Sequence, residues 1–293
     1  MTTTPTRTRN AAAFPLALGG CLLAVSVVTA VVVGAMTPSA AITSLEAFGQ
    51  WLGWFCGVGL LVAINVALAA SVVTQRGTPP RFAIALVAAT LTFYLASFLL
   101  ALARGWTVNA WVAQQPGAAR SILTWLPFAS LLQMLLVAAL SLALAWKLGG
   151  RGTVPVMWTV RARRALGAVV AFGAGIGLLP LQGRLMAMLD LVSLPTLQLG
   201  LPFLAVTLGV AHALLWGLWP VRAGSGVWPA FVSAALVGPL LLAIAWLSQF
   251  ILVRIEQPVV VSAVASALLL ACPLLAWASC RTAGNRVPRA RPR

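Results

Sequence analysis

Acidic residues are almost missing from this sequence. Asp and Glu together number three in 293 residues, and charged residues of all kinds make up 8%. Soluble domains carry about 25% charged residues, so a water-soluble enzyme is excluded. Apolar residues reach 61%, and they form repeated runs of at least about 18 residues, enough to cross a bilayer. Because lipid cannot satisfy free backbone groups, we expect an all-α, polytopic transmembrane helix bundle.

The common signatures of metals, cofactors and catalysis are also absent. The sequence has four cysteines and one histidine, and no two cysteines are spaced as in a CxxC motif. It contains no HExxH, GxSxG or phosphate-binding glycine loop. We therefore expect no metal and no cofactor, and an enzymatic role ranks behind the other interpretations.

Eight apolar runs define the expected organisation of the chain. Residues 1–13 form an N-terminal segment, and the bundle occupies 14–280. The basic tail, 281–293, is predicted to be disordered from its Pro and Arg content. The spans are expected over residues 14–36, 50–74, 82–103, 122–146, 165–181, 201–221, 227–253 and 257–280.

The basic residues predict the topology. The net charge is +16 at pH 7, but the Arg residues gather at the ends of apolar runs rather than along a soluble face, so nucleic acid is not an expected partner. With the N-terminus inside, fifteen of the 19 basic residues fall on cytoplasmic segments and four on the other side. Both termini are therefore predicted to be cytoplasmic.

The membrane and the partners follow from composition. Arg-rich usage with abundant Ala and Leu is typical of a GC-rich bacterial genome, so we place the protein in the inner (plasma) membrane as a multi-pass protein. Its expected partners are the lipid bilayer, with anionic lipids at the cytoplasmic face. A membrane or cytoplasmic protein that docks on the basic tail is a further expected partner.

The chain can also be interpreted as two halves of four helices. Each half has a long outer loop with one acid, Glu46 or Asp190, and a span that closes with Leu-Ala-Trp at 144–146 or 275–277. Four spans per half would give parallel repeats. The third outer loop breaks the pattern, because it is long in the first half and very short in the second. Chance similarity between short apolar helices is the competing interpretation of this 4+4 repeat.

Small residues predict which helix is central. Gly167, Ala171 and Gly175 recur every four residues in the fifth span, and Gly173 and Gly177 form a second such pair. Small residues at this spacing let helix backbones approach closely in lipid. We therefore expect the fifth span to be central in the bundle.

The deepest polar side chains are the candidate substrate-binding residues. No span has an interior Asp, Glu, Lys or Arg, which argues against coupling to protons or sodium through such groups. Asn65, Gln133 and His212 remain as candidates. The alternative for His212 is a neutral imidazole hydrogen-bonded across helices to Gln133 or Asn65.

The segment after the fifth span predicts a short amphipathic interfacial helix near 183–193. Leu185, Met188, Leu189 and Val192 have the spacing of one apolar stripe, which turns Asp190 toward water. Glu46 lies where the second span begins. If Glu46 and Asp190 met over the bundle mouth and burial raised one pKa, they would be candidate catalytic carboxylates.

Three functions remain open from the sequence. The leading hypothesis is a permease-like subunit for an apolar or weakly polar solute. The second is a non-catalytic partner: a sensor, immunity or assembly subunit. The third is a lipid-modifying or cyclising enzyme that uses the two outer carboxylates.

Overall fold

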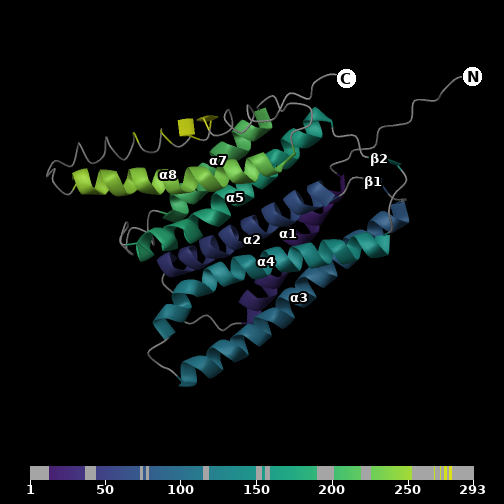
Figure 1. The fold of residues 1–293 in the computed structure, drawn as a ribbon, viewed down its shortest axis with the longest axis horizontal. Coiled ribbons are helices and arrows are strands. Elements are labelled where there is room, and N and C mark those ends of the chain that lie inside the picture. Colours follow the sequence, from purple (N-terminus) through teal and green to yellow (C-terminus); the bar gives the residue numbers. More distant parts are fainter. Residues whose placement is uncertain are drawn as a thin grey trace, which may run out of the picture.

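The computed structural model describes nine segments of the chain and a few helical positions between 267 and 278. The segments are 13–36, 44–72, 75–76, 79–114, 119–149, 154–155, 159–189, 201–218 and 226–252. They contain seven helices and one pair of two-residue strands. The helices are α1 (Ala13–Met36), α2 (Ser44–Val72), α3 (Pro79–Gln114), α4 (Ala119–Gly149), α5 (Val160–Met188), α7 (Leu201–Leu218) and α8 (Trp228–Leu252), and the strands are β1 (Gln75–Arg76) and β2 (Val154–Pro155) (Figure 1).

Five of these helices, α1 to α5, are long and apolar enough to cross a membrane by length and composition. Helices α7 and α8 carry shorter apolar stretches within the described residues. The prediction of a helical, multi-pass membrane protein is thus confirmed at the level of five candidate spans. The eighth expected span, 257–280, lies mostly outside the described residues.

The outward faces of the bundle are apolar, as lipid contact requires. Leu91 and Leu95 on α3 are 65% and 62% exposed, Leu140 on α4 is 63% exposed, and Val31 on α1 is 66% exposed. In water, faces of this kind would drive aggregation. Against acyl chains they carry no such cost, because lipid tails are as apolar as leucine.

Helix α5 is central, as its glycine spacing predicted. It contacts α2, α4, α7 and α8, and Figure 1 shows α7 and α8 on one side of it and α3 and α4 on the other. The backbones touch at glycines: a Cβ on Gly173 would collide with the backbone oxygen of Gly59 on α2, and one on Gly175 would lie 2.9 Å from the Cα of Gly209 on α7. These contacts replace side-chain packing with backbone packing.

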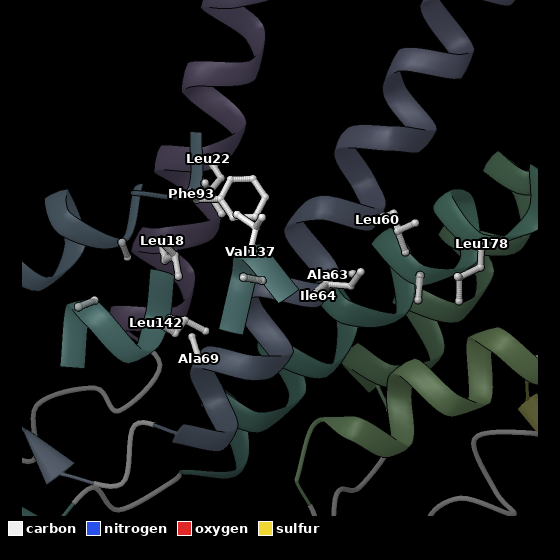
Figure 2. Packing of buried hydrophobic residues seen from close by; sticks show 14 of the residues in the cluster. Leu18, Leu22, Leu60, Ala63, Ile64, Ala69, Phe93, Val137, Leu142 and Leu178 are labelled. Atoms are coloured by element: carbon white, nitrogen blue, oxygen red, sulfur yellow. The ribbon is translucent and has the colours of Figure 1, made fainter. Parts of the chain in front are cut away.

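The other main core joins α1 to α4. Leu22 of α1, Ile64 of α2, Phe93 of α3 and Val137 of α4 belong to one buried cluster (Figure 2). Beside it, the hydroxyl of Tyr94 on α3 donates to the backbone oxygen of Leu22 at 2.5 Å and is also 2.7 Å from the Ser26 hydroxyl. Helices α1 and α3 are therefore joined by hydrogen bonds as well as by packing.

The two short strands join two links at one end of the bundle. Gln75 pairs with Pro155 and Arg76 with Val154 in an antiparallel register. Strand β1 lies between α2 and α3, and β2 lies between α4 and α5. The link after α2 and the link after α4 therefore meet at the same end.

The helices on either side of the third outer loop extend beyond the expected spans. The predicted loop after residue 103 is mostly helical, since α3 continues to Gln114 and α4 begins at Ala119. At 1.5 Å per residue, the 36 residues of α3 are about 54 Å long, well beyond a hydrocarbon core of about 30 Å. The helix thus continues for ten residues beyond Arg104, although Gly105, Thr107 and Asn109 are weak helix formers.

The interfacial helix expected near 183–193 is not separate from the fifth span. Helix α5 runs without a break through Pro180 to Met188, and the Leu189 N–H closes it on the Leu185 oxygen at 3.2 Å. The polar residues after 181 suggested a break, but Gly183 is buried within α5. A proline that neighbouring helices surround does not end a membrane helix. Residues 190–193 lie outside the described residues.

Candidate functional site

Two of the three predicted binding residues are fully enclosed by the bundle. Asn65 on α2 and His212 on α7 both have an exposed fraction of 0%. Gln133 on α4 is half-buried. Figure 1 shows α4 and α7 on opposite sides of the α2–α5 pair, so the structure does not bring Gln133 and His212 together.

His212 is hydrogen-bonded across helices, as the alternative interpretation proposed, but its partner was not among those expected. Its Nε2 lies 3.1 Å from the hydroxyl of Ser233 on α8, and Ser233 is itself 3% exposed. Small hydroxyl residues are common in helices, so Ser233 gave no signal in the sequence that it faced a histidine. The pair joins α7 to α8 inside the bundle.

Asn65 has an incomplete set of hydrogen bonds. Its Nδ2 donates to the backbone oxygen of Leu61, one turn earlier, at 2.9 Å. Its Oδ1 is buried and has no hydrogen-bond partner among the described residues. A buried acceptor left without a donor costs about 1–3 kcal/mol, so this oxygen is a place where a donor from outside the chain would be stabilised.

Gln182 on α5 is a half-buried amide with a buried oxygen, and the sequence analysis missed it. Its Nε2 donates to the backbone oxygen of Ala235 on α8 at 2.5 Å, while its Oε1 has no hydrogen-bond partner among the described residues. Gln182 looked like the start of a polar surface segment. Its position seven residues after Gly175, on the packed side of α5, is the signal that would have placed it inside.

The proposed pair of carboxylates remains a prediction. Glu46 belongs to the first turn of α2, which begins at Ser44. The Glu46 side chain and the whole of Asp190 lie outside the described residues. Their separation is therefore untested.

The polar residues that are buried in the described bundle are neutral, namely Asn65, His212 and the serines Ser26, Ser141 and Ser233. Such groups can bind a ligand through hydrogen bonds without the cost of a buried charge. Within the described residues, no group of three His, Cys, Asp or Glu is placed to hold a metal ion. No family model matches the chain, and neither a curated protein nor a solved structure matches it.

Proposed function

We propose that the chain is an integral protein of the bacterial inner membrane, a permease-like subunit that binds or moves an apolar or weakly polar solute. The observation that carries the proposal is the buried Asn65 oxygen without a hydrogen-bond partner among the described residues. In a bilayer, each unsatisfied polar group costs several kcal/mol. An acceptor kept at that cost inside a bundle is best explained by a ligand that satisfies it transiently.

The chemistry of the groups restricts the solute. Charged solutes in membranes are usually met by ionisable side chains. The buried polar residues around α5 are Asn65, His212 and Ser233, and the Oε1 atom of the half-buried Gln182 is buried beside them. A neutral molecule with few hydrogen-bonding groups suits them better. This is the reason to favour an apolar or weakly polar solute over an ion.

Transport is tested by the transbilayer movement of a defined probe. The full chain is reconstituted in vesicles with an NBD-labelled long-chain alcohol, and dithionite quenching reports its movement between leaflets. We expect faster quenching than in protein-free vesicles, and Asn65→Leu should return the rate to the protein-free value. Leu95→Ala, which changes an outward face of α3, is the matched control and should keep the wild-type rate. Equal rates with and without the wild-type protein would refute the proposal.

We also propose eight spans, in two halves of four, with both termini in the cytoplasm. The pairing of β1 with β2 supports this arrangement, because it joins the links after α2 and α4 at one end of the bundle. Both links carry basic residues, including Arg76 and Arg151, as cytoplasmic links do.

Reporter fusions test this topology. We expect green fluorescence from fusions after Gly150 and Arg293, and alkaline phosphatase activity from fusions after Gln115 and Ser193. A fluorescent protein folds in the cytoplasm, while the phosphatase needs the oxidising periplasm for its disulfides. Phosphatase activity after Arg293 would show an odd number of spans. Phosphatase activity from the fusion after Gly150 would show that the first half has the opposite orientation.

A further inference from the structure

Helix α2 has two glycine faces, and among the described residues one of them packs against another helix while the other does not. Gly59 packs against Ile176 of α5, so that a Cβ there would collide with the isoleucine side chain. Gly53 and Gly57 lie on the opposite side of the helix, since 200° of rotation separates residues 57 and 59. Both are exposed, and no atom of another described helix lies within 4 Å of a Cβ built on either. Because glycine has no side chain, the surface of α2 is hollowed at these two positions, and we call this strip the glycine groove.

The open face continues into the bundle in steps of four residues. Leu61 follows Gly57 at this spacing, and Asn65 follows Leu61, so the four residues form one winding stripe. Leu61 is half-buried and packs against the buried cluster that includes Leu22, Phe93 and Val137. Asn65 is fully buried. The exposed part of the stripe thus ends at Leu61, and Asn65 lies directly beyond it.

The amide of Asn65 lies over the turn of α2 that precedes it. Side chains on a helix tilt toward its N-terminus, and the Nδ2 of Asn65 donates to the Leu61 oxygen at 2.9 Å. Its Oδ1, on the same amide carbon, therefore lies beside the turn that contains Leu61. This oxygen has no hydrogen-bond partner among the described residues. The glycine groove and the unpaired acceptor are independent observations, and both lie on the same row of residues along α2.

We propose that this strip binds a slender apolar molecule with one hydroxyl group, of the class of long-chain alcohols. The chain lies along Gly53 and Gly57, and the hydroxyl donates to the Oδ1 of Asn65 when the Leu61 side chain rotates away. From Gly53 to Asn65 the stripe is about 18 Å long. One leaflet makes up about 15 Å of a hydrocarbon core of about 30 Å, so the stripe is about as long as one leaflet is thick. The inference rests on the proposed function and names the class of solute.

A neutral hydroxyl matches the site better than a charged donor. The three acidic residues of the chain are Glu46, Asp190 and Glu256, so none lies in the stripe from 53 to 65. An ammonium group bound at Asn65 would keep an uncompensated charge in lipid. An alcohol needs one acceptor only, and Asn65 supplies one.

The experiment compares two probes that differ in one hydrogen-bond donor, the hydroxyl group. Full-length protein in vesicles of phosphatidylglycerol and phosphatidylethanolamine is photolabelled with hexadecanol that bears a diazirine at the chain end, or with its methyl ether. A hydrogen bond with a net value near 1 kcal/mol changes occupancy about fivefold. We therefore expect about fivefold more labelling of α2 by the alcohol than by the ether.

Three variants locate the site. Asn65→Leu should remove the preference for the alcohol, because both probes then meet an apolar side chain. Gly57→Leu should lower labelling by both probes, because it fills the groove. Gly20→Leu is the matched control: Gly20 on α1 is exposed, with nothing within 4 Å of a Cβ, and labelling of α2 should be unchanged. Thermal unfolding of each variant confirms that it is folded.

The outcomes separate this site from the proposed function. Equal labelling of α2 by alcohol and ether in the wild type, or an alcohol preference that survives Asn65→Leu, would overturn the site even if NBD-alcohol movement is fast. A fivefold preference without any acceleration of that movement would uphold the site and refute transport. Labelling that Gly57→Leu leaves unchanged would also overturn the site.

Discussion

Replacing Gly173 with alanine is expected to weaken the contact between α2 and α5 more than any other single-methyl change in the described bundle. A Cβ at residue 173 would collide with the Gly59 backbone oxygen and lie 2.8 Å from the Ala63 Cβ. Backbone atoms cannot rotate away as a flexible side chain can, so the two helices must separate. Overpacking of this kind costs about 1–3 kcal/mol, and Gly173→Leu should prevent folding of the bundle.

Thermal unfolding in detergent, followed by the fluorescence of the 12 tryptophans, measures this effect. The control is Gly20→Ala, whose new methyl meets no atom within 4 Å. That change should be neutral or slightly stabilising, since alanine is the better helix former by about 1 kcal/mol. Equal melting temperatures for Gly173→Ala and Gly20→Ala would mean that α2 and α5 are not in backbone contact.

The second large effect has the opposite sign, because Asn65→Leu is expected to stabilise the protein. The change removes a buried oxygen that has no hydrogen-bond partner among the described residues, together with a local bond from Nδ2 to Leu61. Relief of an unsatisfied buried acceptor contributes about 1–3 kcal/mol. Hydrogen bonds between side chains in membranes average only about 0.6 kcal/mol. Leucine keeps the branched shape of asparagine at Cγ, with methyl groups in place of the amide oxygen and nitrogen.

Ser141→Ala is the matched control for this prediction. Ser141 is also buried, but its hydroxyl is satisfied by the Ala138 oxygen at 3.0 Å. Its removal should leave stability unchanged or lower it slightly. If Asn65→Leu melts below the wild type, the Asn65 oxygen must be satisfied by a group of the protein or by lipid. A stabilised variant that no longer moves the NBD-alcohol would separate loss of function from loss of folding.

The helical, multi-pass character could be predicted because it depends on properties of single segments of the sequence. Apolar run length decides whether a segment can cross lipid, and small residues every four positions decide which helix can approach its neighbours most closely. The central place of α5 followed from Gly173, Gly175 and Gly177 for this reason. None of these inferences needed to know which helix lies beside which.

The missed features all depend on contacts between helices. Gln182 looked like a surface residue because nothing in the sequence shows that the Ala235 oxygen lies 2.5 Å from its amide. Ser233 was overlooked for the same reason, although its hydroxyl lies 3.1 Å from His212. The continuity of α5 beyond Pro180 also depends on the neighbouring helices. They make the loss of one backbone hydrogen bond at the proline tolerable.

The pairing of β1 with β2 also restricts how the bundle can move. It ties the hairpin of α3 and α4 to α2 and α5 at one end. At the other end, Arg104 of α3 donates to the Ser130 hydroxyl of α4 at 2.6 Å, which holds the hairpin to itself rather than to the rest of the bundle. Between these two ends, the buried cluster of α1 to α4 and the Tyr94 hydroxyl hold the hairpin to its neighbours. Any movement of the hairpin away from α2 must therefore break this cluster as well as the strand pairing.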